Sequence, residues 1–383
     1  MIYRDLGRTG FKVSEIGLGG EYLEGKDSRT VKAVVDRAMA GGVNILDCFM
    51  SNPEVRSNLG RALEGRREKM CVQGHLRSVW KDGQYGRTLE IGEVKAHFED
   101  LLARFRTDYI DIGVIHLIDG EEDFNAVFQG DILAYALSLK DKGVIRKLGL
   151  SSHNPVWALK AAKSGLLDML LFSINPAYDV LSEKSPRPRA LQSDLFDGVP
   201  LDNGINRVRE ELYRYCAQAG IGITAMKCLG AGMLLSESAT PFSRAMTARQ
   251  CIRYALDRPA VSSVLIGMQS EAEVEDCLAY ESTPPEETDY SFVFASQPRF
   301  RMDGRCMYCN HCLPCSAKIN IAQVSKYLDI ALLSGAASPT LREHYRALEH
   351  RAGECMECGR CEKNCPFHVP IVKRMKKAAE LFE

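Results

Sequence analysis

The chain has 383 residues, a length that suits one large domain followed by a smaller one. Its 49 Lys and Arg residues almost balance its 50 Asp and Glu residues, which argues against binding to nucleic acid or to a membrane surface through bulk charge. The sequence shows neither an apolar run of about 18 residues nor a signal-peptide core, so we expect a cytoplasmic protein with no membrane association.

The first part of the chain, up to residue 280, alternates short apolar strands with amphipathic helices. The first helix is typical, because Val31, Val34, Val35 and Ala38 recur at the spacing of one helical face. The predicted strands are Ile16–Gly19, Val43–Asp47, Lys69–Gln73, Tyr109–His116, Leu148–Ser151, Met169–Ile174, Ile221–Met226 and Ser263–Ile266. The predicted helices are Thr30–Ala40, Val55–Glu64, a helix through Val94–Phe105, Ile132–Lys142, Pro155–Ser164, Asn206–Ala219, Thr247–Asp257 and Glu271–Tyr280.

This alternation predicts an α/β fold with a parallel sheet. Eight strand-then-helix units within residues 1–283 favour a closed (β/α)8 TIM barrel, which needs about 250 residues. The competing open, doubly wound sheet would carry a G-x-G-x-x-G turn after its first strand. The sequence Gly17-Leu-Gly-Gly20 does not have that spacing, so the barrel is preferred.

Two predicted loops, about residues 76–92 and 175–205, are longer than a strand-to-helix connection usually is. Each is either a solvated excursion or a lid over the carboxyl ends of the strands, where barrel enzymes keep their sites. Residues 284–298 are polar and contain Pro284-Pro285, so we interpret them as a linker. Residues 299–383 then form a second domain, whose helix-like segments Ile321–Leu333 and Pro339–Glu349 indicate a mostly α-helical, ferredoxin-like type.

The second domain contains two runs of four cysteines. The later run has the spacing C-x2-C-x2-C-x3-C-P, the bacterial ferredoxin signature of a [4Fe–4S] site, in which the fourth cysteine of each run ligates the other cluster. Structural zinc is the alternative, but zinc sites usually use two separated cysteine pairs. Ser316 stands where the first run would have proline. The predicted ligands are Cys306, Cys309, Cys312 and Cys365 for one cluster, and Cys355, Cys358, Cys361 and Cys315 for the other.

Polar residues also stand at the carboxyl ends of the predicted strands, where a barrel places its catalytic groups. A histidine there, such as His116, can instead be a hydrogen-bonded core residue, and Asp47 can be a helix N-cap. The candidates are Asp47, His75, His116, Ser151, Ser152, His153, Asn175, Lys227 and Gly267.

Several segments of the barrel region resemble the aldo-keto reductases, and the cysteine tail resembles the subset of that family with a C-terminal [4Fe–4S] dicluster domain. The segments are 3–20, 42–47, 109–116, 142–152, 226–234 and 264–268. The resemblance implies reduction of a carbonyl by NAD(P)H with an Asp-Tyr-Lys-His tetrad. Tyr is the acid, Lys lowers its pKa, Asp holds Lys, and His orients the carbonyl.

Matched residue by residue to that tetrad, Asp47 and His116 are kept, whereas Asn52 stands at the Tyr position and His75 at the Lys position. Asn52 cannot donate a full proton, so His75 is the alternative acid or base. Tyrosines from loops, Tyr22, Tyr85 or Tyr178, are further alternatives.

The resemblance also implies a dinucleotide site, with departures from the family pattern. Gln269 replaces the arginine that holds the 2′-phosphate, and Asn175 replaces the aromatic residue that stacks on nicotinamide. NAD, NADP or no nicotinamide therefore stay open. The residues compatible with a bound dinucleotide are Ser151, Ser152, Lys227, Gly230, Gly232 and Gly267.

Three functions follow as hypotheses. The first is an iron–sulfur oxidoreductase acting on a small carbonyl or hydroxyl compound, which exchanges electrons with the clusters and through them with an external electron carrier. The second is a non-redox lyase or isomerase that uses Asp47, His75 and His116 for acid–base work and has structural clusters. The third is an electron-transfer subunit whose barrel has lost catalysis.

Overall fold

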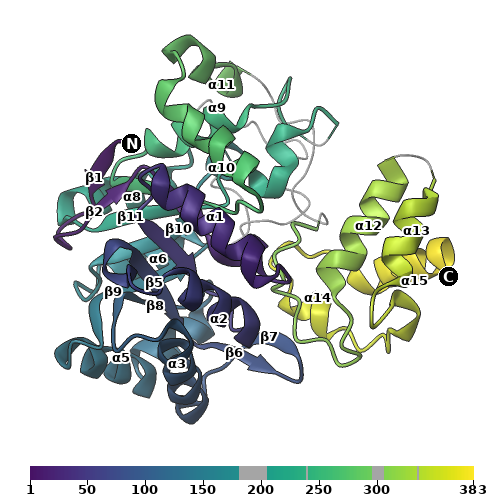
Figure 1. The fold of residues 1–383 in the computed structure, drawn as a ribbon, viewed down its shortest axis with the longest axis horizontal. Helices are drawn as coiled ribbons and strands as arrows, with labels where there is room; N and C mark the ends of the chain where they lie inside the picture. The colour runs from purple at the N-terminus through teal and green to yellow at the C-terminus, as the bar shows by residue number, and fades with distance from the viewer. Residues whose placement is uncertain (181–204, 239, 296–305, 334–335) are drawn as a thin grey trace. The chain divides into compact units, whose positions relative to one another are not determined.

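The computed structural model describes most of the chain (Figure 1). The described residues are 1–180, 205–238, 240–295, 306–333 and 336–383. They divide into two compact units, one made of residues 1–79, 87–180 and 205–295 and the other of residues 80–86 and 306–383. The short segment 80–86 therefore belongs to the cysteine-containing unit, although its neighbours in sequence belong to the other unit.

The first unit is a closed barrel of eight parallel strands in the order β10-β11-β12-β3-β4-β5-β8-β9, which confirms the predicted α/β barrel. Each predicted strand is present, with ends shifted by up to a few residues. The strands are β3 (Ile16–Gly19), β4 (Ile45–Cys48), β5 (Cys71–Leu76), β8 (Ile110–Ile115), β9 (Ile145–Ser152), β10 (Met169–Ser173), β11 (Gly222–Met226) and β12 (Val261–Ile266).

Helices follow the strands around the barrel, and asparagine caps several of their N-termini. Asn52, Asn154 and Asn206 accept hydrogen bonds from backbone N–H groups two residues later, which satisfies donors that have no partner within the helix. The sequence did not predict α4 and α7. The helices are α1 (Ser28–Ala40), α2 (Pro53–Ala62), α3 (Ile91–Phe105), α4 (Glu121–Phe128), α5 (Asp131–Asp141), α6 (Pro155–Ala162), α7 (Pro176–Asp179), α8 (Arg207–Ala219), α9 (Ala248–Leu256) and α10 (Glu271–Leu278).

An N-terminal hairpin, β1 (Tyr3–Asp5) with β2 (Lys12–Ser14), supplies apolar side chains to the strand residues of the barrel. Leu6 and Val13 are fully buried in one cluster with Ile45, Ile112 and Met169. A buried polar pair accompanies this apolar packing: the Gln73 amide donates to Thr224 Oγ1 over 3.0 Å, and Thr224 pairs in the sheet with Leu171, a member of the same apolar cluster.

The described residues of both long loops contain regular secondary structure. Residues 76–92 contain a second hairpin, β6 (Ser78–Lys81) with β7 (Gln84–Arg87). The loop predicted at 175–205 begins with α7, and its residues 181–204 lie outside the described residues. The predicted linker begins with a 3₁₀ turn, Pro285–Thr288, and the short helix α11 (Phe292–Ala295).

A buried cluster around Asp179 fixes both ends of this second loop. The Asp179 carboxylate is fully buried and accepts hydrogen bonds from Arg209, Tyr213 and Tyr254. Its backbone carbonyl accepts from the Asn206 N–H over 2.6 Å. A buried charge is tolerated only when it is paired and hydrogen-bonded, so this cluster holds the chain that follows β10 in one position.

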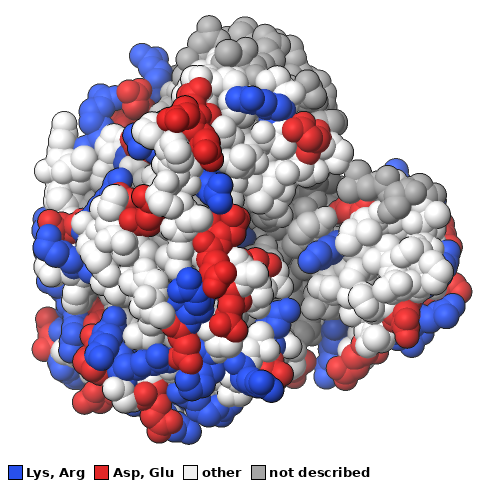
Figure 2. Space-filling view, turned by 45° about the horizontal axis from the view of Figure 1, so that its top comes forward, with Lys and Arg blue, Asp and Glu red and all other residues white. Residues whose placement is uncertain are grey.

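The second unit contains α12 (Ile321–Leu333), α13 (Pro339–Arg346), α14 (Arg360–Asn364) and α15 (Ile371–Phe382), so its described part is helical as predicted. Tyr345 stacks on Phe382 with ring centroids 4.4 Å apart. The ferredoxin-like character of this unit stays a prediction. Among the described helices, none combines the length and apolar character needed to cross a membrane. On the face drawn in Figure 2, cationic and anionic side chains are interspersed, consistent with the net charge of −1.

Replacing Asp179 with alanine should destabilise the protein by about 3–5 kcal/mol, because Arg209 is left as a buried cation without its counter-charge. Tyr254→Phe, which removes one hydrogen bond, should cost about 1 kcal/mol. Denaturant unfolding followed by circular dichroism measures both. Glu211→Ala, which breaks an exposed ion pair with Lys163, is the control, and an equal loss in Asp179→Ala and Glu211→Ala would contradict the prediction.

Candidate functional site

Three of the predicted catalytic residues form one hydrogen-bonded chain at the carboxyl ends of three neighbouring strands. Asp47 lies on β4, His75 on β5, and His116 directly follows β8. His75 Nε2 lies 2.9 Å from Asp47 Oδ1, and His75 Nδ1 lies 2.8 Å from His116 Nδ1. All three are buried, at 6%, 1% and 6% relative exposure, so the chain is shielded from bulk water.

This chain determines which ring nitrogens carry protons when both histidines are neutral. Asp47 is an acceptor when ionised, so His75 donates to it from Nε2. His75 Nδ1 is then an acceptor, and His116 donates to it from Nδ1. The basic nitrogen of His116 is consequently Nε2. Protonation there gives an imidazolium whose charge is balanced through His75 by the Asp47 carboxylate, an arrangement suited to general acid–base catalysis.

Phe49 and Arg77 hold His116 in place. The ring of Phe49 is stacked on the imidazole, with centroids 5.6 Å apart and an interplanar angle of 5°. The buried Arg77 guanidinium donates to the carbonyl oxygens of His116 over 2.9 Å and of Leu117 over 3.2 Å. Nothing in the sequence singled out Arg77, because its role depends on contacts between β5 and the end of β8.

Asn52, which we expected at the position of the family's tyrosine, has structural contacts. Its Oδ1 accepts the Glu54 N–H as the cap of α2, and its Nδ2 donates to Glu24 Oε1 over 3.0 Å. Burial raises the pKa of Glu24, whereas the hydrogen bond from Asn52 lowers it. Asn52 therefore positions a helix and a carboxylate and supplies no proton.

Three of the residues expected at a dinucleotide are bonded within the barrel. Asn175 caps α7 through the Tyr178 N–H and donates to the Lys227 carbonyl oxygen over 2.9 Å. Ser151 Oγ accepts the Leu117 N–H, and Ser152 Oγ donates to the Ile118 carbonyl oxygen, each over 2.8 Å. These side chains hold strand ends together.

The remaining dinucleotide candidates lie on turns after β11 and β12. Lys227 Nζ lies 3.6 Å from a carboxylate oxygen of Glu21, and the Gln269 N–H donates to Glu273. Gly230 and Gly232 have φ values of 56° and 87°, in the region that favours glycine. At Gly267 a Cβ atom would overlap the ring of Tyr22, so this position accommodates an aromatic ring. Of the loop tyrosines, Tyr85 and Tyr178 are buried, at 6% and 3% exposure.

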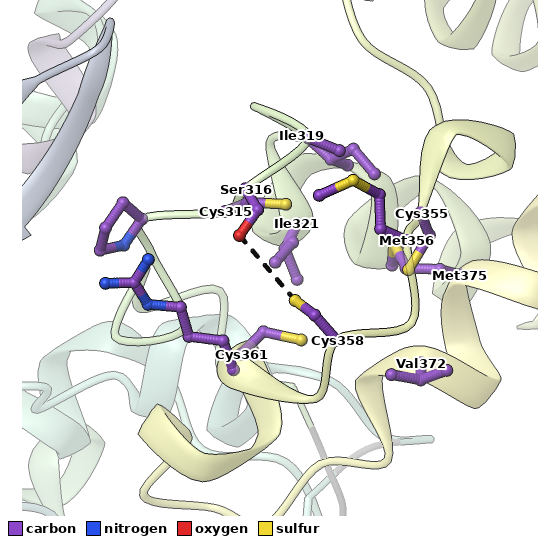
Figure 3. A pocket seen from close by; sticks show the side chains of 13 residues that line it. Cys315, Ser316, Ile319, Ile321, Cys355, Met356, Cys358, Cys361, Val372 and Met375 are labelled. Atoms are coloured by element: carbon purple, nitrogen blue, oxygen red, sulfur yellow. Dashed lines mark hydrogen bonds between the residues drawn. The ribbon is translucent and has the colours of Figure 1, made fainter.

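In the second unit, four of the predicted cluster ligands line one pocket (Figure 3). They are Cys315, Cys355, Cys358 and Cys361, the set that pairs the last cysteine of the first run with the first three of the second. The pocket encloses about 380 Å³ including its open side, and Ile319, Ile321, Val372 and Met375 supply apolar walls. Ser316, at the expected proline position, places its Oγ 3.9 Å from Cys358 Sγ.

The other predicted set also gathers in this unit. Burial raises the pKa of Cys312 well above its usual range, and the nearby Cys309, Cys306, Cys365 and, more weakly, Cys361 raise it further. Burial raises the pKa of Cys361 to about 11, with smaller contributions from Cys315 and Cys355. The thiols of the two runs therefore interact electrostatically with one another, and the pocket contains Cys315 beside the cysteines of the second run.

Corresponding residues of the two cysteine runs have left-handed backbone conformations. Residues two and four positions after the first cysteine have positive φ in both runs, at 51° and 59° for Tyr308 and Asn310, and at 54° and 69° for Glu357 and Gly359. Residues three positions after the last cysteine do so as well, at 58° for Lys318 and 47° for His368. Alternation with left-handed residues turns successive N–H groups to one side, the concave arrangement found at many iron–sulfur sites.

Within the described residues, no group of three His, Cys, Asp or Glu side chains forms a site for a single metal ion. A cubane makes a different demand, because each of its four thiolates binds a separate iron at a separate corner. Two sets of four cysteines, an apolar pocket beside one of them and left-handed residues within both runs fit that demand.

The comparisons with known proteins concern the barrel. Residues 15–250 match the model of the aldo/keto reductase family. The aldo-keto reductase YhdN of Bacillus subtilis is 27% identical over 170 residues, covering 40% of this chain and 48% of YhdN, about half of that relative. L-galactose dehydrogenase of Arabidopsis thaliana is 23% identical over 308 residues, covering 72% of this chain and 86% of that protein.

A solved structure shares the fold. The aldo-keto reductase AKR11C1 of Bacillus halodurans, in its holo form, superposes with a TM-score of 0.59 at 20% identity. The superposition covers 77% of this chain and 96% of AKR11C1. The cysteine runs begin at Cys306, beyond the residues that match the family.

Asn52→Ala should raise the pKa of Glu24 further, because it removes the hydrogen bond that favours the carboxylate. Since the pKa of Glu24 in the folded protein already lies above its ordinary value, ionisation of Glu24 reduces stability as pH rises through that range. The reduction should be larger in the variant, in addition to about 1 kcal/mol for the lost cap. NMR titration of Glu24 and unfolding at several pH values measure these effects. Asn154→Ala, which removes a cap from α6, should leave the pKa of Glu24 unchanged; equal pKa values in all three proteins would refute the assignment.

Proposed function

The chain belongs to the aldo/keto reductase family, and from this premise we propose that it is an oxidoreductase acting on a small carbonyl or hydroxyl compound. We propose further that its C-terminal unit holds two [4Fe–4S] clusters that exchange electrons with the substrate and with an external carrier. The observation that carries the barrel half of the proposal is the buried chain Asp47–His75–His116. Reduction of a carbonyl to an alcohol requires two electrons, one from each reduced cluster, and two protons: this chain would donate the proton that ends on the substrate oxygen, and water would supply the proton that ends on carbon.

In this proposal His116 transfers the proton at Nε2 to or from the substrate oxygen. His75, bonded to the other nitrogen of His116, accepts part of the charge change, and Asp47 stabilises the cationic form of the pair. Neither the absent tyrosine nor a lysine is needed, because a histidine pair next to a buried carboxylate can supply the acid. Phe49 and Arg77 keep the His116 ring in one orientation while it does so.

The residues at the expected dinucleotide positions do not fit a clamp for the 2′-phosphate. Gln269 has no charge, and Glu273 accepts its backbone N–H. The cation among the expected dinucleotide residues, Lys227, is paired with Glu21. Carboxylates at both positions disfavour a phosphate. No step of the proposed reaction therefore uses NADPH.

The cysteine sets supply the second half of the proposal. Cys306, Cys309, Cys312 and Cys365 would hold one cluster, and Cys355, Cys358, Cys361 and Cys315 the other. When bound, such clusters supply or accept single electrons at low potential. Cys358 is exposed, and Met356 beside it is 63% exposed, so a carrier protein could approach this set from solvent.

A non-redox alternative uses the same histidine chain. Acid–base catalysis alone, as in a lyase or isomerase, needs only Asp47, His75 and His116, and the clusters would then only stabilise the C-terminal unit. Such an enzyme would turn over its substrate with fully oxidised clusters and without any reductant, whereas the proposed oxidoreductase would stop under those conditions.

Protein purified without oxygen should contain about eight iron and eight sulfide per chain, as two cubanes require. Crossed ligation predicts that Cys365→Ser perturbs the same cluster as Cys306→Ser, and that Cys315→Ser perturbs the same cluster as Cys355→Ser. Electron paramagnetic resonance of the reduced variants distinguishes the two clusters. Cys216→Ser, which changes a buried barrel cysteine, is the control. Colourless protein containing zinc would contradict the proposal.

His116→Gln and His75→Gln should each lower kcat by about 100-fold or more, because general acid–base catalysis contributes about 10²–10⁴-fold. Asn52→Ala should retain turnover within a few-fold, since its contacts are structural. Carbonyl reduction driven by a reduced viologen dye measures these rates. Unchanged kcat in both histidine variants, with intact clusters, would remove the chain from the mechanism.

A further inference from the structure

Gln84 makes an unusual contact with one of the cysteines. Its side-chain Nε2 donates to the Cys315 carbonyl oxygen over 2.8 Å, and its Oε1 accepts the Cys315 N–H over 2.7 Å. Gln84 lies on β7 within segment 80–86, which belongs to the same unit as Cys315 although 231 positions separate them in sequence. The side chain is buried, at 7% exposure.

The equivalent cysteine of the other run needs no such contact. Cys365 follows α14, and its N–H donates to the Glu362 carbonyl oxygen within the same turn, over 3.2 Å. The first run is one residue shorter between its third and fourth cysteines, and Pro314 directly precedes Cys315. In this run the Cys315 N–H is bonded to Gln84 instead of to a preceding carbonyl oxygen.

The backbone carbonyl oxygens of Cys315 and Cys365 accept equivalent hydrogen bonds. The Cys315 carbonyl oxygen accepts from the Lys318 N–H over 3.0 Å, and the Cys365 carbonyl oxygen accepts from the His368 N–H over 3.3 Å. The two runs therefore match in this turn and differ in how the N–H of the last cysteine is satisfied. A primary amide carries N–H donors and a carbonyl acceptor in a single plane, so Gln84 can bond both backbone groups of Cys315 at once.

We propose that Gln84 is a positioning residue for the cluster held by Cys315, Cys355, Cys358 and Cys361, replacing the helical turn that the first run lacks. The inference rests on the proposed clusters. Without Gln84 the partly buried N–H of Cys315 would lose its acceptor, and the fourth thiolate would be free to move away from its iron. The cluster of the other set, whose last ligand Cys365 is held by α14, should be insensitive to Gln84.

The test compares Gln84→Met with the wild-type protein, because methionine has a similar shape but offers no hydrogen bonds to the Cys315 backbone. Iron release to a chelator after mild oxidation should be about tenfold faster for one of the two clusters, in line with the loss of two hydrogen bonds to partly buried backbone groups. Electron paramagnetic resonance should show a three-iron product from that cluster alone. Gln218→Ala, on the exposed face of α8, is the matched control and should behave as wild type.

Gln84→Glu keeps the acceptor for the Cys315 N–H and loses the donor, so its rate should lie between those of wild type and Gln84→Met. If Gln84→Met does not fold, the rate of iron release from Gln84→Glu tests the proposal instead. Equal release rates in wild type and in the folded Gln84 variants would overturn the role of Gln84 and leave the clusters standing. Wild-type protein without iron and sulfide would overturn the proposed function and this inference with it.

Discussion

The constraint on which the C-terminal unit depends is that each cysteine run presents its last thiolate to the other run. Cys315 lines a pocket with Cys355, Cys358 and Cys361, and the thiol of Cys365 contributes to the raised pKa of Cys312. Crossing of this kind ties two segments together that are separated by α12 and α13. A unit of this size buries a small apolar core, so bound clusters would contribute to folding as structural metals do in other small domains. Residues such as Gln84, which hold the backbone of a cluster ligand in position, would then also stabilise the fold of the unit.

The barrel depends on a second polar arrangement, the buried series from Asp47 to His116. In a closed parallel barrel the ends of β4, β5 and β8 lie side by side, so three residues distant in sequence meet at hydrogen-bonding distance. The residues expected at the tetrad positions make other contacts here: His75 bonds both Asp47 and His116, and Asn52 caps α2. A proton source of this kind suits a reaction whose electrons arrive separately from its protons.

The sequence could predict much of the barrel, because each strand is a short apolar run followed by an amphipathic helix, and Ile16–Gly19 matches β3 at both ends. It could place Asp47, His75 and His116 at strand ends. It could not predict that His75 bonds His116, because that distance depends on the register and tilt of separate strands. Gln84 and Arg77 were missed because their side chains contact segments that are distant in sequence. The strands β6 and β7 are also only four residues each, too short to be predicted from a sequence pattern. The role of Asn52 had a readable signal, since asparagine followed by proline is typical of a helix start.

The central claim is that the protein couples single-electron carriers to a two-electron carbonyl reaction. The most direct measurement is an anaerobic titration in which chemically reduced protein, freed of excess reductant, is mixed with small aldehydes and ketones while cluster absorbance and product are followed together. The account predicts that the clusters reoxidise as alcohol forms, with about one product per chain carrying two reduced cubanes. Product formation with clusters that stay reduced, or clusters that stay reduced with every carbonyl tested while another small molecule is isomerised or cleaved, would contradict it.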